Sequence, residues 1–261
     1  MDKLTLINKI NKIIKNTEND IAILVKDLCQ NEIVFNYNEE KSYVSASIIK
    51  VPVMLEALSR VNKSEKLSLS NLVKIKDSDK VQFSIITEQD LKECTYEELI
   101  EWMIIASDNT ATNVIIDILG IDKINNRIKD LGMKNSILQR KMMDFKAIEK
   151  GKNNYTSLED MLKVMEGLYR GTILSENELY KKAINILKNQ RDNGMLKRYI
   201  KENVVLANKT GELDNLNNDV GIFYTENTDY FIGVFAQELS SNQEGYKIIG
   251  EISKVVYEYF N

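Results

Sequence analysis

The stretch Ser45–Met54, SASIIKVPVM, places a serine and a lysine, Ser47 and Lys50, three residues apart in an otherwise apolar run. On a helix these two side chains share a face, so we expect the amine to lie within reach of the hydroxyl. If Ser47 opens the helix, the positive end of the helix dipole would also favour an oxyanion formed beside it. Taken alone, however, the spacing is better explained by a capping serine followed by a lysine that extends to solvent.

The chain contains no histidine, so neither a Ser-His-Asp triad nor a Cys-His pair can be formed. A serine nucleophile would need another base, and a lysine can serve if burial and nearby cations lower its pKa enough to leave it neutral. Two distant cysteines, Cys29 and Cys94, are too few for a disulfide framework or a zinc site, and we expect both to be reduced. We therefore expect neither a metal nor another cofactor.

The composition is that of an ordinary globular protein, with 261 residues, 43% of them hydrophobic and 28% charged. The net charge of −4 argues against a nucleic-acid partner. No apolar run approaches the ~20 residues of a membrane span, and residues 1–16 have the pattern of an amphipathic helix rather than of a signal peptide. We expect a monomer; its location stays open, cytoplasmic as written but extracytoplasmic if a leader was removed.

Strand patterns occur near both ends of the chain, and a long helical pattern separates them. The expected strands cover residues 20–28, 32–38, 203–211, 219–225 and 229–239, with helices at 1–16 and 241–260 and a helical block at 47–189. These patterns predict an α/β fold of the α+β type, in which strands from both ends join one antiparallel sheet. We expect one lobe from residues 1–44 and 190–261, a helical lobe from 45–189, and a site in the cleft between them.

Two further polar triplets change the interpretation of Ser47 and Lys50. Ser107, Asp108 and Asn109 follow a strongly apolar helical pattern, and the sequence Lys-Thr-Gly at 209–211 ends an expected strand. Each triplet alone would be an ordinary turn. All three motifs, in this order and in these contexts, are not plausibly coincidence.

With these motifs the chain resembles the serine penicillin-recognising enzymes, and among them the class A β-lactamase-like branch. The likeness covers nearly the whole chain. Residues 81–91 resemble the family's segment before the Ser-Asp-Asn helix, 131–140 the lead-in to its omega loop, and 218–224 the strand after Lys-Thr-Gly. The resemblance implies the β-lactamase/transpeptidase-like fold, with a five-stranded antiparallel sheet flanked by the terminal helices and a helical lobe.

The resemblance also implies roles in acylation. Ser47 would be the acylated nucleophile, and Lys50 its proton partner. Ser107 would relay a proton to the leaving nitrogen. The backbone N–H groups of Ser47 and Glu212 would form the oxyanion hole.

Substrate binding would fall to the remaining motif residues. Asn109 would hold the amide side chain of the substrate, and Lys209 and Thr210 would bind its carboxylate. Gly211 would let the substrate backbone lie close to the strand. Phe83 would lie at the mouth of the cleft, although a surface-packed aromatic explains it as well.

The omega loop departs from the family pattern. In class A β-lactamases a glutamate two residues after the arginine that matches Arg140 activates the deacylating water, and here that place holds Met142. Lys146 replaces the asparagine that helps to hold this water. A shift of the register would bring Asp144 to the site but would break the Leu-Gln-Arg anchor. Glu212 is a second departure, because the lactamases usually have a small residue there; its carboxylate would disfavour an anionic ligand.

These residues predict a serine acyl-enzyme formed at Ser47 with D-Ala-D-Ala-type stem peptides or β-lactams. Because acylation and deacylation are separate steps, the loss of the glutamate would slow only the second. We therefore expect an activity like that of the class A-like penicillin-binding proteins that act as DD-peptidases, with weak β-lactam turnover. The alternatives are a true β-lactamase with an unrecognised base, a receptor module that stays acylated, and an esterase or amidase.

Overall fold

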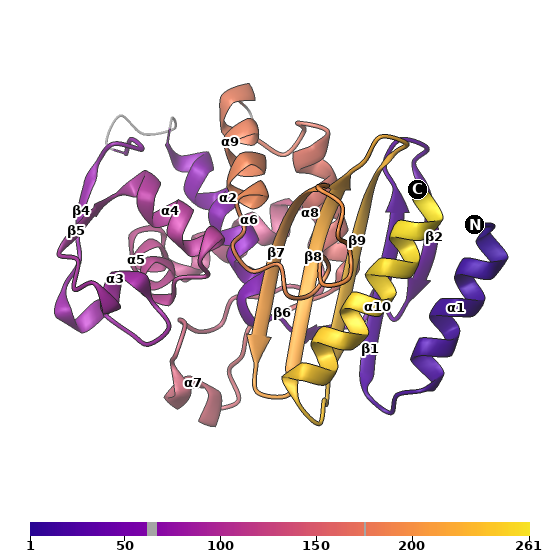
Figure 1. Ribbon diagram of the computed structural model, residues 1–261. Helices are drawn as coiled ribbons and strands as arrows, with labels where there is room; N and C mark the ends of the chain where they lie inside the picture. The colour runs from indigo at the N-terminus through magenta and orange to yellow at the C-terminus, as the bar shows by residue number, and fades with distance from the viewer. Residues whose placement is uncertain (62–66, 175) are drawn as a thin grey trace.

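The computed structural model describes residues 1–61, 67–174 and 176–261, and its centre is a five-stranded antiparallel sheet (Figure 1). The strand order is β2–β1–β9–β8–β7, so strands from the two ends of the chain meet where β1 pairs with β9. The bounds are β1 Asp20–Asp27, β2 Glu32–Tyr37, β7 Val205–Leu213, β8 Leu216–Tyr224 and β9 Asp229–Gln237. The predicted fold class is confirmed.

Both faces of the sheet are covered, which explains why its central strands are buried along nearly their whole length. Side chains on β1 alternate between the two faces. Ala22 and Leu24 join the core shared with the helical block, and Ile21, Ile23 and Val25 join the core under the terminal helices.

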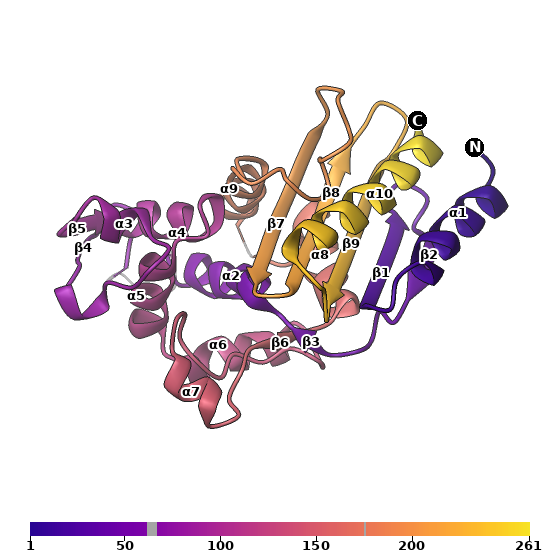
Figure 2. The same cartoon turned by 60° about the horizontal axis from the view of Figure 1, so that its bottom comes forward.

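The two terminal helices lie side by side on one face of the sheet, as Figures 1 and 2 show. They are α1, Lys3–Lys15, and α10, Asn242–Phe260. Leu6 and Ile10 of α1 are completely buried in the core that this pair forms with the sheet. The amphipathic pattern at the N-terminus therefore reflects packing on the sheet.

The segment between β2 and β7 is mainly helical, and part of it covers the opposite face of the sheet. Its elements are η1 Ala46–Ile49, α2 Lys50–Arg60, η2 Asp77–Asp79, α3 Ile85–Glu88, α4 Tyr96–Ile105, α5 Asn109–Leu119, α6 Ile121–Asp130, α7 Phe145–Glu149, α8 Leu158–Tyr169 and α9 Asn177–Lys188. α8 packs on β9 and β1, and α9 packs on β7. Because one large core runs from the sheet into these helices, the division into two lobes stays a prediction.

Four short strands also occur in this segment, and three of them lie within residues 47–189, the block that was predicted to be helical. β3, Tyr43–Val44, pairs with β6, Tyr155–Thr156, and β4, Leu72–Lys74, pairs with β5, Glu93–Thr95. Pieces of two or three residues are too short to show an alternating pattern, and pairing with distant segments decides their conformation.

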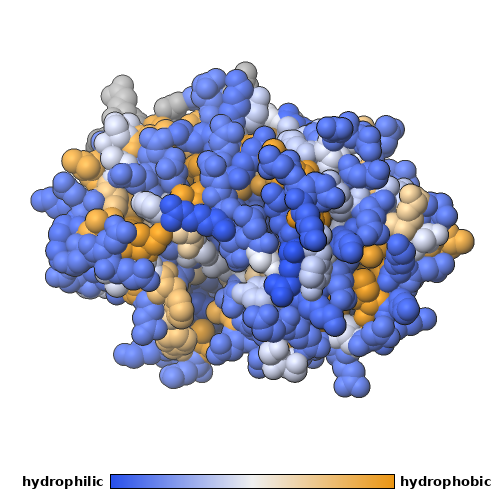
Figure 3. All heavy atoms as spheres, in the orientation of Figure 1, coloured by the Kyte–Doolittle hydropathy of each residue, from blue (hydrophilic) through white to orange (hydrophobic). Residues whose placement is uncertain are grey.

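The surface seen in Figure 3 is predominantly hydrophilic, with apolar residues showing in limited areas. Within the described ranges, no helix combines the length and the hydrophobicity needed to cross a membrane. The two cysteines are free thiols, Cys29 exposed and Cys94 buried.

Candidate active site

Ser47 lies in a tight turn directly before a helix. The turn is the 3-10 segment η1, and α2 begins at Lys50, so Ser47 does not cap the α-helix. Ala46 has φ 45°, a left-handed conformation that is uncommon for a residue with a side chain. Ser47 is half-buried, and it lies next to a lysine with no exposed surface.

The Lys50 ammonium is surrounded by acceptors from a distant part of the chain. Its Nζ donates to the carbonyl oxygen of Ser107 (2.6 Å), to Ser107 Oγ (3.2 Å) and to Asn109 Oδ1 (2.9 Å). These contacts use the three donors of an ammonium, and no Lys50–Ser47 hydrogen bond occurs among the described residues. The Lys50–Ser47 contact expected from helical spacing is therefore replaced by contacts of Lys50 with Ser107 and Asn109, at the start of α5.

Burial lowers the pKa of Lys50 well below its usual range, and the positive charge of Lys209 lowers it further. The Asp108 carboxylate opposes this shift. A buried lysine with a lowered pKa can lose its proton near neutral pH and then act as a base.

Ser107 connects the two buried lysines. Its Oγ accepts from Lys50 Nζ at 3.2 Å and from Lys209 Nζ at 3.1 Å. A hydroxyl has two lone pairs and one proton, so while it accepts both bonds its proton can still be donated to another group. Ser107 has φ 53°, a left-handed conformation often found where a site fixes a side chain.

Asp108 and Asn109 fix the loop at residues 82–86 through hydrogen bonds of their side chains. Asp108 is completely buried; its carboxylate accepts from Ser84 Oγ (3.0 Å) and from the backbone N–H groups of Ile86 and Ala111 (3.1 and 2.8 Å). Asn109 Nδ2 donates to the carbonyl of Gln82 at 3.1 Å. These bonds fix the loop whose tip carries Phe83.

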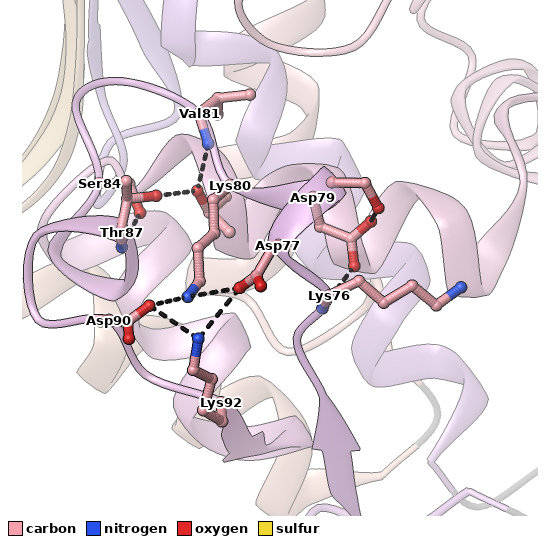
Figure 4. A network of polar contacts seen from close by, with 11 residues as sticks. Lys76, Asp77, Asp79, Lys80, Val81, Ser84, Thr87, Asp90 and Lys92 are labelled. Atoms are coloured by element: carbon pink, nitrogen blue, oxygen red, sulfur yellow. Dashed lines mark hydrogen bonds and ion pairs between the residues drawn. The ribbon is translucent and has the colours of Figure 1, made fainter.

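Residues 76–92 are also braced at their outer side (Figure 4). Lys80 and Lys92 each pair with both Asp77 and Asp90. Phe83 itself is 75% exposed and has φ 56°. An aromatic residue in this strained conformation, on a braced loop, is presented to solvent rather than packed.

Strand β7 forms the other side of the site and is the edge strand of the sheet. A side chain at Gly211 would place its Cβ 3.0 Å from the Ser45 carbonyl oxygen and 3.1 Å from the Ser47 backbone nitrogen. The strand therefore packs directly on the turn that carries Ser47, and the backbone of Glu212 follows at the next position.

Lys209 reaches the site from this strand. It is completely buried, and its Nζ also donates to the Thr210 carbonyl at 2.6 Å. Burial lowers the pKa of Lys209 to about 8, although the carboxylates of Asp219 and Asp192 oppose the shift. Burial likewise raises the pKa of Asp219 to about 7. The lysine is thus cationic near neutral pH and can bind an anion.

The omega-loop residues are held by amides. Arg140 Nε donates to Asn153 Oδ1 (3.0 Å), which anchors the start of the loop. Asn113 binds both sides of the backbone at Met142: it accepts from the Met142 N–H (2.7 Å) and donates to the Met142 carbonyl (3.1 Å). Asp144 accepts from the Ala147 N–H (3.0 Å) and caps α7.

Asn113 was missed in the sequence analysis. The signal was present, since Asn113 lies four residues after Asn109 on α5 and therefore on the same helix face. A cavity of about 220 Å³ adjoins this place, lined by Met142, Asp144 and Asn113 among others. In the described ranges, no group of three or more Cys, Asp or Glu side chains is arranged to hold a metal ion.

Comparisons with known proteins show which family model, relatives and solved structures the chain is similar to. The sequence profile of the beta-lactamase enzyme family matches residues 5–260. Beta-lactamase BRO-1 of Moraxella catarrhalis is 24% identical over 282 residues, covering 99% of this chain and 88% of its own. The crystal structure of a beta-lactamase from Sphaerobacter thermophilus is 26% identical, with a TM-score of 0.88 over 100% of this chain and 98% of its own. PBP-A, 23% identical, shares the fold, with a TM-score of 0.88 over 98% of this chain and 96% of its own.

Proposed function

The chain belongs to the beta-lactamase enzyme family and is a serine hydrolase, and from that premise we propose that it acts as a DD-peptidase-like acyltransferase, forming an ester at Ser47 with D-Ala-D-Ala-type peptides and opening β-lactams slowly. The observation that carries this proposal is the hydrogen-bonded series Lys50–Ser107–Lys209, in which one hydroxyl accepts hydrogen bonds from two buried lysines. This arrangement supplies a base, a proton relay and a cation without a histidine.

In the proposed acylation, the Ser47 hydroxyl attacks the substrate carbonyl and its proton passes to neutral Lys50. The developing oxyanion is stabilised by the backbone N–H groups of Ser47 and Glu212. In support, a Cβ at Gly211, the residue before Glu212, would lie 3.1 Å from the Ser47 backbone nitrogen. Ser107 then gives its proton to the leaving nitrogen and is reprotonated from Lys50, while cationic Lys209 keeps the hydroxyl oriented.

The same geometry supports the proposed binding of the substrate. Lys209 and Thr210 bind the carboxylate, and Asn109, whose amide is fixed by Lys50 and Gln82, binds the amide on the acyl side. Because β7 is an edge strand, its backbone can also pair with an extended peptide.

The proposal of slow β-lactam turnover rests on Met142. Asn113 holds the backbone of residue 142 from both sides, and Met142, a residue only 6% exposed, stands at the position where the resemblance expects a glutamate. A thioether cannot take a proton from water. Asp144, the nearest substitute in sequence, already accepts a bond from the Ala147 N–H at the start of α7.

The second candidate is a true β-lactamase, and two observations favour it. Relatives from Moraxella catarrhalis and Bacteroides uniformis carry that name, and Asp144 lines the same cavity as Met142. In that case Asp144 would serve as the base for deacylation.

Intact-protein mass spectrometry over time distinguishes the two. With benzylpenicillin, the proposal predicts an adduct that persists after free ligand is removed, together with release of D-Ala from a D-Ala-D-Ala peptide. An adduct that vanishes within seconds with continued β-lactam hydrolysis supports the second candidate. If the protein forms no adduct and releases no D-Ala, the proposed function is contradicted.

A further inference from the structure

Glu212 is tied to the C-terminal helix. Asn242 Nδ2 donates to Glu212 Oε1 at 2.8 Å, and the Tyr246 hydroxyl donates to Glu212 Oε2. Burial raises the pKa of Tyr246, and the hydrogen bond to Glu212 raises it further, so the phenol keeps its proton and stays a donor. Two donors from α10 therefore hold the carboxylate of a residue whose backbone belongs to the site.

The start of α10 can make these contacts because it lies close to the sheet. A side chain at Gly245 would place its Cβ 2.3 Å from Asn217 Oδ1, so only glycine allows this approach. Asn217 is the cross-strand partner of Glu212, which places both side chains on the face that α10 covers. The carboxylate is thereby turned toward the helix and away from Gly211 and Ser47.

The backbone of Glu212 lies near the place where a ligand anion is proposed to bind. Glu212 is two residues from Thr210 on one strand, a separation of about 7 Å along the backbone. Glu212 is exposed, so its negative charge acts on that place through water as well as protein.

We propose that Glu212 is a specificity-determining residue that disfavours ligands with an anionic group beside Lys209 and Thr210, and that Tyr246 and Asn242 limit this penalty by holding the carboxylate against α10. The inference rests on the proposed function, since it concerns the anion subsite of the same acylation. The site then discriminates less against ligands whose carboxyl group is esterified or amidated than it would with a neutral residue at position 212.

The expected size of the effect follows from the separation. Taking the backbone separation of about 7 Å as the scale, two like charges in largely aqueous surroundings change an equilibrium by about threefold. Freeing the carboxylate from Tyr246 lets it move closer to the ligand, which enlarges the penalty. Added salt screens exposed charges and reduces both effects.

The test compares second-order acylation rate constants for benzylpenicillin, an anion, and for its neutral methyl ester. The variants are Glu212→Gln, Tyr246→Phe, the double variant, and Tyr257→Phe as a matched control on the same helix. We expect Glu212→Gln to raise the anion-to-ester ratio about threefold at low salt. Tyr246→Phe should lower the ratio, but not in the Glu212→Gln background, and Tyr257→Phe should leave it unchanged.

An unchanged ratio in Glu212→Gln, or an equal loss for both ligands, would overturn the inference and show that the cluster only braces the strand. In that case the wild-type protein is still acylated and the proposed function stands. Failure of the wild-type protein to be acylated by either ligand would instead overturn the proposed function, and the inference with it.

Discussion

Raising the pH through about 8 should slow acylation by anionic β-lactams, because this change removes the charge from Lys209. Burial lowers the pKa of this lysine from its ordinary value of 10.5 to about 8. The side chain is therefore cationic below that pH and neutral above it. A ligand carboxylate would lose its cationic partner over a range in which an exposed lysine would stay charged.

The magnitude follows from the fraction of Lys209 that is charged. One pH unit above its pKa only about a tenth of the side chains carry a proton, so the rate constant at about pH 9 should be about tenfold below that expected for a fully cationic Lys209. The lower limb of the profile belongs to Lys50, which must lose its proton to act as a base. Acylation should consequently show a bell-shaped dependence on pH.

The assay is the second-order rate constant for acylation by benzylpenicillin, measured by intact-protein mass spectrometry between about pH 5.5 and 10. This constant reports the pKa values of the free enzyme, so the carboxylate of a bound ligand does not shift the pKa of Lys209 that the profile measures. The methyl ester of benzylpenicillin serves as the matched ligand without a carboxylate, and Lys209→Met as the variant without the titrating group. A profile that stays flat from pH 7 to 10, or an alkaline limb that persists in Lys209→Met, would refute the reasoning.

Three substitutions test other parts of the site. Met142→Glu, with its backbone held by Asn113, should speed hydrolysis of the penicilloyl-enzyme at least about tenfold, with a smaller change in acylation. Chase experiments measure the rates of both steps. Equal changes in the two rates would contradict the position assigned to residue 142. Gly211→Ala forces a methyl group against the turn of Ser47 and should lower the acylation rate about tenfold or more, whereas a wild-type rate would show that this contact does not shape the oxyanion hole. Asp108→Ala leaves two buried N–H groups without their acceptor, so it should lower the free energy of unfolding by about 2–4 kcal/mol. Urea titration measures this loss, and Asp77→Ala, a substitution of an exposed carboxylate, should not reproduce it.

The elements of the sheet could be predicted from the sequence because their patterns are local. The expected strand at residues 20–28 is β1, Asp20–Asp27, and the expected helix at 241–260 is α10, Asn242–Phe260. The strand order could not be derived from pattern alone. It depends on the pairing of β1 with β9, whose residues are about 200 positions apart.

The residue types of the site could be predicted, but not their contacts. Ser47 was expected to start a helix and to face Lys50, whereas it lies in a 3-10 turn and Lys50 contacts Ser107 and Asn109. Such contacts arise when separate elements pack together, and helical periodicity carries no information about them. The same holds for the Tyr246–Glu212 contact, which joins the last helix to an edge strand.

The omega loop illustrates a further limit. Residues 140–156 fall within the block that was expected to be helical, but in place of a long helix they contain the short helix α7 and the strand β6. Asp144 starts α7 by capping it, and pairing with β3 creates β6. Short elements of this kind are fixed by single polar contacts, which a periodic pattern does not reveal.

The central claim is that Ser47 carries the acyl group, and peptide mapping of the benzylpenicillin-treated protein tests it most directly. We expect the penicilloyl mass on the peptide that contains Ser47, and no adduct in Ser47→Ala, while Ser45→Ala, two residues away in the same turn, keeps it. An undiminished adduct in Ser47→Ala, or a label mapped to another residue, would contradict the account.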